Sequence, residues 1–236
     1  MKKTLGIIGG MGPLATAVLF ERIIQLTDAS CDRDHLRILI DNNTSIPDRT
    51  AFLMGEKNDP YPLVLASLKS LEKIGAEVFI MPCNTAHYCI KTLETQTIHP
   101  IVDIVKATTK EIINDSSLQE GLGLLGTLGL TKFPNYVATL QKHKISCFTL
   151  DPLDQEKVSH LIYDIKARGI TRKNQAEWEN ILLSLKRRGW CHFILGCTEL
   201  SLMAYSMSNK LPFINSIDCL AREAITVCGY PVKKEG

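Results

Sequence analysis

Two halves of the chain carry the same pattern of residues, and this repeat limits the possible folds more than any other feature. LGIIGGMG around Gly9 matches LGLLGTLG around Gly126, VFIMPCNT matches HFILGCTE, and HPIVDI matches LPFINS. The spacing agrees as well, because Gly9 lies 74 residues before Cys83 and Gly126 lies 71 residues before Cys197. A period this long indicates a duplicated domain and not a solenoid repeat.

Short apolar runs alternate with helical patterns along both halves. The runs are TLGIIGG, LRILID, EVFIMP, PIVDIV, GLGLLGT, ISCFTL, CHFILG and PFINSI. They are apolar almost throughout, as are parallel strands covered on both faces, and the segments between them are long enough for crossover helices. We expect an α/β fold of two similar open parallel-sheet βα domains, with the active site in the cleft between them. The first domain takes residues 1–103 plus 213–236, and the second takes residues 104–212.

Composition excludes several classes of partner. The 236 residues, 45% of them hydrophobic, can bury a large core. A net charge of +2 with 22% charged residues gives no basic stripe, so we expect no nucleic-acid partner. No apolar run approaches the ~20 residues of a membrane-spanning helix. Gly9, Gly10 and Gly12 would break the helix of a secretory leader, so we predict a cytoplasmic protein with reduced thiols.

Cysteines are numerous, but only two of the eight stand in equivalent places. The chain has no C-x-x-C pair and no zinc-ligand spacing, so we expect no metal site. Cys83 and Cys197 each follow an apolar strand and precede residues that favour a helix start, Asn-Thr in one case and Thr-Glu in the other. The positive end of such a helix favours thiolate over thiol, which makes both cysteines candidate catalytic residues.

Two equivalent thiols suit a symmetric reaction, since one cysteine is enough for nucleophilic catalysis. If Cys83 and Cys197 flank a substrate carbon, one as thiolate can remove a proton from one face while the other returns a proton to the opposite face. Inversion of a stereocentre is such a reaction. The alternative is that both are small buried side chains, as free cysteines commonly are.

The turn GMGPLA, residues 10–15, satisfies the dinucleotide fingerprint G-x-G-x-x-[GA] between a strand and a helix. The acidic residue expected about 20 positions further on is missing, because Asp41 lies 31 residues after Gly10. We therefore favour a turn whose backbone N–H groups receive a carboxylate. A nicotinamide-dependent dehydrogenase stays as the alternative from another class.

The motifs PCNTAHY and GCTEL, together with GIIGGMGP and SIPDR, resemble the aspartate/glutamate racemase family over essentially the whole chain. Glutamate racemases read Gly-Cys-Thr-His at the second cysteine, so Glu199 points to the aspartate racemase branch. The resemblance implies racemisation of aspartate or glutamate by proton transfer between Cys83 and Cys197. It also implies that no cofactor is needed, that the substrate is a small amino acid, and that the protein is a homodimer.

The resemblance also implies which residues bind the substrate. Arg49 and Lys166 would hold the side-chain carboxylate, although either could be a solvated surface charge. The other expected substrate-binding residues lie beside the thiols or in the turns after the first strands: Met11, Asn84, Thr85, Thr127, Thr198 and Glu199. Glu199 would meet the α-amino group or only improve the start of its helix. His87 is open to two interpretations, a general base or a structural residue.

The sequence departs from the family in GTLGLTKFPNY, where Leu130 and Phe133 replace a Thr and a Ser of many relatives. This more apolar wall leaves the substrate range open, with another acidic amino acid or a neutral one as possibilities. Two further functions stay open on the same fold. One is another cysteine-dependent isomerase, such as a maleate-type isomerase or a hydantoin racemase, and the other is a non-catalytic small-ligand binder.

Overall fold

The computed structural model describes residues 1–56, 58–133, 135–207 and 212–234. The chain forms two compact units, Met1–Ala107 with Ile217–Gly236 and Thr108–Ser216. Both divisions lie four residues beyond the boundaries expected from the repeat. At the second division the reason is strand pairing, because the last strand, β7, is hydrogen-bonded to a strand of the second unit.

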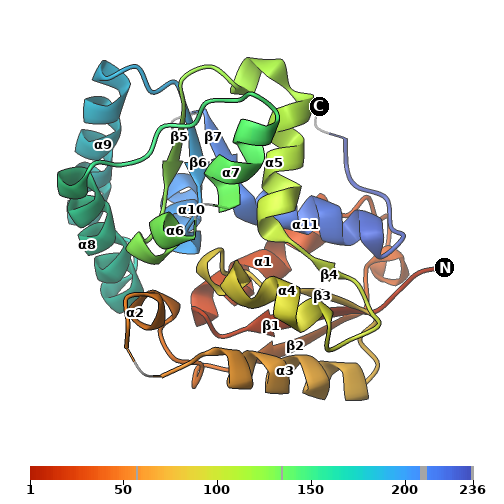
Figure 1. Cartoon of the computed structure of the whole chain (residues 1–236). Helices are drawn as coiled ribbons and strands as arrows, with labels where there is room; N and C mark the ends of the chain where they lie inside the picture. Colours follow the sequence, from red (N-terminus) through yellow and green to blue (C-terminus); the bar gives the residue numbers. More distant parts are fainter. Residues whose placement is uncertain (57, 134, 208–211, 235–236) are drawn as a thin grey trace. The chain divides into compact units, whose positions relative to one another are not determined.

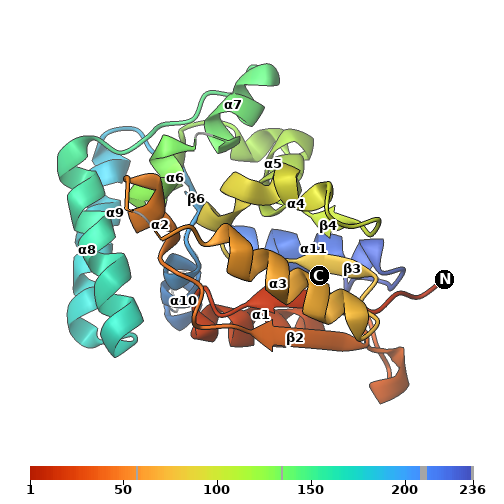
Figure 2. The same cartoon turned by 60° about the horizontal axis from the view of Figure 1, so that its bottom comes forward.

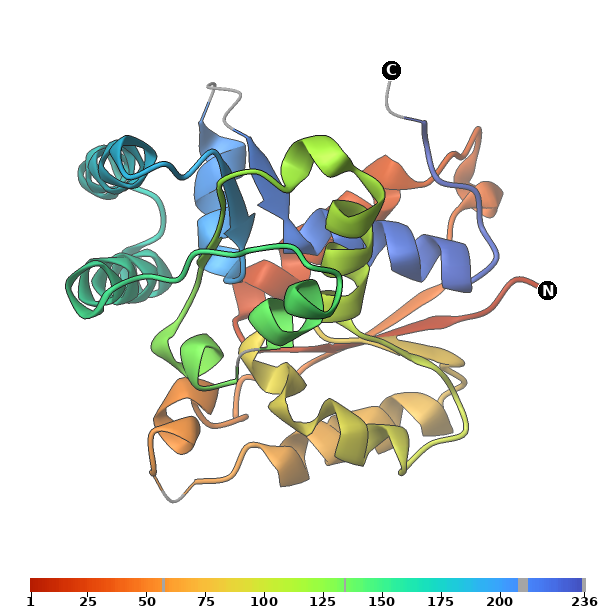
Figure 3. The ribbon, with the colours of Figure 1, turned by 45° about the horizontal axis from the view of Figure 1, so that its top comes forward.

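The first unit is built on a parallel sheet of four strands in the order β2-β1-β3-β4. These are β1 (Leu5–Gly9), β2 (Ile38–Asn42), β3 (Val78–Ile80) and β4 (Ile101–Val102). Leu5 on the central strand pairs with Ile38 on one side and Val78 on the other. Helix α3 covers one face of the sheet, and α1 and α11 cover the other (Figures 1 and 3). Because helices cover both faces of this parallel sheet, its strands are apolar almost throughout.

The helices of the first unit begin and end where the sequence favours it. They are α1 (Pro13–Leu26), η1 (Asp32–Asp34), α2 (Arg49–Leu53), α3 (Tyr61–Lys73), η2 (Thr85–Cys89), α4 (Ile90–Glu94), α5 (Ile104–Asn114) and α11 (Ser216–Val227), of which α5 and α11 cross the divisions between the units. Helix α1 starts with Pro13, whose fixed φ suits a first helical residue. Helix α3 is followed by Gly75 at a φ of 99°, which lets the chain turn away.

The second unit has a parallel sheet of three strands, β5 (Leu122–Leu125), β6 (His192–Leu195) and β7 (Phe213–Asn215), in that order. The predicted α/β fold with parallel sheets is confirmed by both units. The predicted strand ISCFTL is reduced to one bridge, in which Phe148 pairs with Gly123 at the edge of β5. Among the described residues of this run, Phe148 alone exchanges backbone hydrogen bonds with β5, so a regular strand does not form there.

Helices of the second unit include a long antiparallel pair. The elements are η3 (Ser116–Leu118), α6 (Leu128–Lys132), α7 (Asn135–Lys142), α8 (Pro152–Arg168), α9 (Arg172–Arg187) and α10 (Thr198–Ser206). Helices α8 and α9 lie side by side (Figures 1 and 2), and Asp151 and Thr171 cap their N-termini through side-chain oxygens. The buried Trp178 of α9 packs in the same core cluster as Phe193 of β6. Within the described residues, no helix is long and apolar enough to cross a membrane.

Candidate active site

Cys83 lies just past β3, at the carboxyl edge of the first unit's sheet, where ligands of open α/β sheets bind. Its side chain is 7% exposed and belongs to the same core cluster as Met11. The next two residues, Asn84 and Thr85, are also buried; Asn84 is the N-cap residue of the short 3₁₀ helix η2, and Thr85 is its first residue. The first thiol therefore has a tightly packed surrounding, with the predicted substrate-binding residues directly beside it.

His87 uses both ring nitrogens on the backbone of the first unit. The Ile104 N–H donates to Nε2 at 3.2 Å, so Nε2 carries no proton. Nδ1 then carries the proton and donates it to the carbonyl oxygen of Cys83 at 2.9 Å. With both nitrogens engaged, this ring holds the backbone at Cys83 against the start of α5. We therefore expect His87 to be structural and not a general base.

Because His87 is buried, its protonation makes the unfolding free energy depend on pH. The pKa of His87 is lowered, mainly by burial, while the Asp103 carboxylate opposes the shift and the Lys106 ammonium adds to it. The folded chain thus keeps the ring neutral at pH values where the unfolded chain protonates it. Unfolding free energy should fall as the pH drops below about 6.5, by up to about 1.4 kcal/mol per pH unit from this residue.

Urea unfolding of the wild type and His87→Gln between pH 8 and pH 5 tests this expectation. The variant should be less stable at pH 8 but should lose less stability on acidification. His143→Gln, at an exposed position, serves as the control and should follow the wild type. Identical pH slopes for His87→Gln and the wild type would show that the buried ring is not responsible.

Arg49 is the first residue of α2 and is 8% exposed, so it is not a solvated surface charge. Its Nη2 donates to the Met11 carbonyl oxygen at 3.1 Å, and its Nη1 donates to the Pro47 carbonyl oxygen at 2.9 Å. The guanidinium therefore ties the turn after β1 to the segment after β2. Met11 itself is 2% exposed and packs in the core cluster that contains Cys83.

Cys197 is the N-cap residue of α10 in the second unit and is 6% exposed. Its Sγ donates to Glu199 Oε2 at 2.9 Å, and the Thr198 hydroxyl donates to the same oxygen at 3.2 Å. Burial and the Glu199 carboxylate raise the pKa of the Cys197 thiol well above its usual value, while the Lys166 ammonium acts in the opposite direction. The second thiol is thus held in its protonated, proton-donating form, and the expectation that the helix start favours a thiolate is wrong for Cys197, because burial and the Glu199 carboxylate outweigh the helix N-terminus.

Replacing Glu199 by Gln should lower the pKa of the Cys197 thiol and make it more reactive. Removing the nearby negative charge lowers the cost of forming a thiolate, so alkylation of Cys197 by iodoacetamide should become at least about fivefold faster at pH 8. Peptide mass spectrometry can follow Cys197 separately from the other cysteines. Glu179→Gln, on the exposed side of α9, is the matched control and should leave the rate unchanged. An unaltered rate in Glu199→Gln would mean that the carboxylate does not control the thiol.

Thr127 and Cys197 lie at corresponding places on neighbouring strands. Leu125 of β5 pairs with Leu195 of β6, and Thr127 and Cys197 each lie two residues after these paired leucines. Thr127 caps α6 by accepting a hydrogen bond from the Leu130 N–H at 3.3 Å, and it is 7% exposed.

Lys166 is exposed on α8, with Nζ 5.2 Å from the centroid of the Tyr163 ring.

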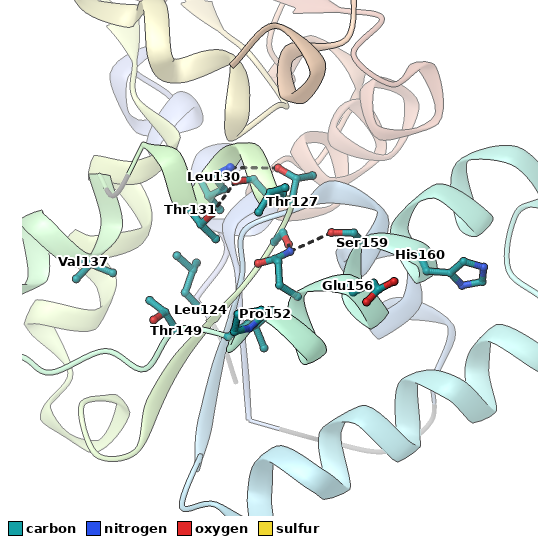
Figure 4. Close-up of a pocket in the computed structure, with 14 residues that line it drawn as sticks. Leu124, Thr127, Leu130, Thr131, Val137, Thr149, Pro152, Glu156, Ser159 and His160 are labelled. Atoms are coloured by element: carbon teal, nitrogen blue, oxygen red, sulfur yellow. Dashed lines mark hydrogen bonds between the residues drawn. The ribbon is translucent and has the colours of Figure 1, made fainter. Parts of the chain in front are cut away.

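A pocket of about 770 Å³ opens beside Thr127 within the second unit (Figure 4). Helices α6, α7 and α8, β5 with the turn after it, and the segment before α8 supply its walls: Leu124, Gly126, Thr127, Leu128, Leu130, Thr131, Val137, Thr149, Leu150, Pro152, Gln155, Glu156, Ser159 and His160. Gln155 holds this wall in place, because its Nε2 donates to the Gly126 carbonyl oxygen at 3.0 Å and to the Ser159 hydroxyl at 3.1 Å.

Each unit contains one set of the residues predicted from sequence. In the first unit these are Met11, Arg49, Cys83, Asn84 and Thr85, and in the second they are Thr127, Lys166, Cys197, Thr198 and Glu199. Thr127 and Leu130, both named from the sequence, line the pocket, whereas its other lining residues share no sequence motif and could not be predicted. Over the described residues, no three His, Cys, Asp or Glu side chains lie where they could hold a metal ion.

Comparison with known proteins identifies the family. The sequence model described as Asp/Glu/Hydantoin racemase matches residues 8–224. The chain belongs to the Asp/Glu/hydantoin racemase family. This confirms the predicted resemblance to aspartate/glutamate racemases, and the chain is therefore a racemase of this family.

Three members or relatives of the racemase family illustrate the likeness. The broad specificity amino-acid racemase RacX of Bacillus subtilis (strain 168) is 27% identical over 94% of this chain and 96% of its own length. The solved Picrophilus torridus aspartate racemase is 28% identical, covers 98% of this chain and 96% of its own, and superposes with a TM-score of 0.85. An aspartate racemase homologue from Pyrococcus horikoshii OT3 shares the fold, with a TM-score of 0.74, 23% identity, and coverage of 96% and 99%.

Proposed function

We propose that the protein racemises an acidic amino acid, aspartate or glutamate, by proton transfer between Cys83 and Cys197. The observation that carries this proposal is the matched placement of the two thiols. Cys83 is buried just past β3 of the first unit's sheet, and Cys197 is buried just past β6 of the second unit's sheet. The names of the relatives support the substrate class, since one of them is an aspartate racemase.

The proposed reaction alternates the roles of the two sulfurs. A thiolate on one face of the substrate removes the α-proton, and the electrons of the broken C–H bond delocalise toward the α-carboxylate. The thiol on the opposite face then donates its proton to the α-carbon and becomes the thiolate. Cys197, held as a thiol by Glu199, suits the donating role in one direction, which leaves Cys83 as the base in that direction. No cofactor takes part in these steps.

The proposal needs the two units to act as two domains that bring one thiol each to the substrate. The α-carboxylate would be bound by Asn84, Thr85 and Thr198 beside the thiols, with Thr127 and Met11 lining the site and Glu199 near the α-amino group. Following the family resemblance, we also propose a homodimer in the cytoplasm. Light scattering after size-exclusion chromatography would test the dimer.

Lys166 is proposed to attract the side-chain carboxylate of the substrate, together with Arg49. Lys166→Ala should lower kcat/KM for aspartate and glutamate by about 30-fold, because a charge-assisted contact is worth on the order of 2 kcal/mol. The fold should be unaffected, since this side chain is exposed. Arg49→Ala should lower both activity and stability, because its guanidinium also holds backbone carbonyls of the turns.

The measurement is kcat/KM by chiral chromatography, with Lys173→Ala on the exposed side of α9 as the control. If Lys166→Ala used aspartate and glutamate as efficiently as the wild type, this lysine would not bind the substrate carboxylate.

A further inference from the structure

The pocket beside Thr127 has the size and the chemistry of a small-molecule site. Its volume of about 770 Å³ falls in the range of roughly 300–1,000 Å³ that such sites occupy. Six of its lining residues are aliphatic: Leu124, Leu128, Leu130, Val137, Leu150 and Pro152. Hydroxyl groups of Thr127, Thr131, Thr149 and Ser159 add polar atoms (Figure 4), as do the side chains of Gln155, Glu156 and His160.

This pocket includes Thr127 at the end of β5, the strand that pairs with the strand before the second thiol. Leu130 is 2% exposed and lines the pocket. A Cβ on Gly196 would come 2.5 Å from Leu130 Cδ2, so the leucine fills the space over the residue that precedes Cys197. Thr127, at the pocket wall, follows β5 as Cys197 follows β6. Neighbouring strands lie about 4.8 Å apart, so a side chain that starts at an α-carbon beside Cys197 can enter the pocket.

The charges around the pocket do not suit an acidic side chain. Of the described residues that line it, none is Lys or Arg, Glu156 contributes a carboxylate, and the imidazole of His160 has its Nδ1 3.6 Å from Glu177 Oε1 outside the pocket. Arg49, expected to bind such a side chain, donates from both terminal nitrogens to backbone carbonyls of its own unit. A carboxylate would lose hydration in the pocket without gaining a cation, whereas an aliphatic side chain gains by leaving water.

We propose that this pocket receives the side chain of neutral aliphatic amino acids, so that leucine and methionine are substrates in addition to the acidic amino acids. The proposal rests on the proposed racemase function, because the thiols of Cys83 and Cys197 would act on the α-carbon in the same way. The amino and carboxylate groups would stay at the thiols, and only the direction of the side chain would differ. Leu130 is then a specificity-determining residue, since it forms the wall between the pocket and the backbone of Gly196.

Racemisation of L-leucine, L-methionine, L-aspartate and L-glutamate by the purified full-length protein tests the proposal. The wild type should racemise leucine and methionine, and Cys197→Ser should abolish this turnover. Leu128→Asp adds a carboxylate to the pocket at a residue 36% exposed, where folding should tolerate it. This variant should lose at least about tenfold more kcat/KM for leucine and methionine than for aspartate. Leu183→Asp, 53% exposed on α9 and outside the pocket, should leave all four rates unchanged.

The outcomes separate this inference from the proposed function. Turnover of aspartate or glutamate without turnover of leucine or methionine would overturn the pocket proposal and leave the proposed function standing. Equal losses for all four substrates in Leu128→Asp would also overturn it, because the pocket would then not hold the side chain. No turnover of any of the four would overturn the proposed function as well.

Discussion

Replacing either Cys83 or Cys197 by serine should lower amino-acid racemisation by about 10³-fold or more, while the fold is kept. Serine has nearly the shape of cysteine, but its hydroxyl is a far weaker acid and a poor base near neutral pH, so each variant would lack one of the two proposed proton-transfer groups. Removing a positioned acid or base typically costs about 10²–10⁴-fold in rate. The measurement is the rate of interconversion of L- and D-aspartate by circular dichroism or chiral chromatography.

Each unit offers a matched control for its cysteine. Cys31 in the first unit and Cys191 in the second are free and exposed. Cys31→Ser and Cys191→Ser should therefore racemise at the wild-type rate. If Cys83→Ser or Cys197→Ser also kept the wild-type rate, that cysteine would be only structural, and the reaction would need another acid or base. His87 is poorly suited to that role, because both its nitrogens bind backbone groups.

Gly10→Ala should destabilise the first unit by about 3 kcal/mol or more, because it combines backbone strain with a clash. Gly10 has a φ of 88°, a backbone angle that residues other than glycine rarely adopt. A Cβ there would come 2.3 Å from the carbonyl carbon of Asn43, and a backbone atom cannot move aside as a flexible side chain can. Since this turn also carries Met11, activity should fall together with stability.

Gly75→Ala separates the two causes. Gly75 has a similar φ of 99°, but a Cβ there would have no atom within 4 Å. We therefore expect a cost of about 1–2 kcal/mol from strain alone. Urea unfolding followed by circular dichroism gives both values. Equal losses in the two variants would contradict the account, because the clash with Asn43 would then contribute nothing.

The fold could be predicted from the sequence because the signals that set it are local. Apolar runs of six or seven residues between helical patterns anticipate the seven strands described in the two sheets. ISCFTL shows the limit of this reasoning, because Phe148 forms only a single bridge. Whether an apolar run becomes a regular strand depends on how many backbone hydrogen bonds a neighbouring edge offers, and the run itself does not contain that information.

The candidate site could be predicted in part. The repeat singles out Cys83 and Cys197, because packing alone does not require a matched pair. Hydrogen bonds between distant residues could not be predicted, such as those from Arg49 to Met11 or from Ile104 to His87. They depend on how the turns after different strands meet at one edge of a sheet. For the same reason, the burial of Arg49 could not be predicted from the residues around it in the sequence.

The most direct test of the two-thiol account is exchange of the α-proton with solvent, followed by proton NMR in deuterated buffer. L- and D-aspartate should be incubated separately with the wild type, Cys83→Ser and Cys197→Ser. The account predicts that the wild type introduces deuterium into both enantiomers as it interconverts them. Each variant should exchange at most one enantiomer, without inversion, and the two variants should differ in which one. A variant that exchanged both enantiomers, or a wild type that interconverted them and kept the original α-proton, would contradict proton transfer between two thiols.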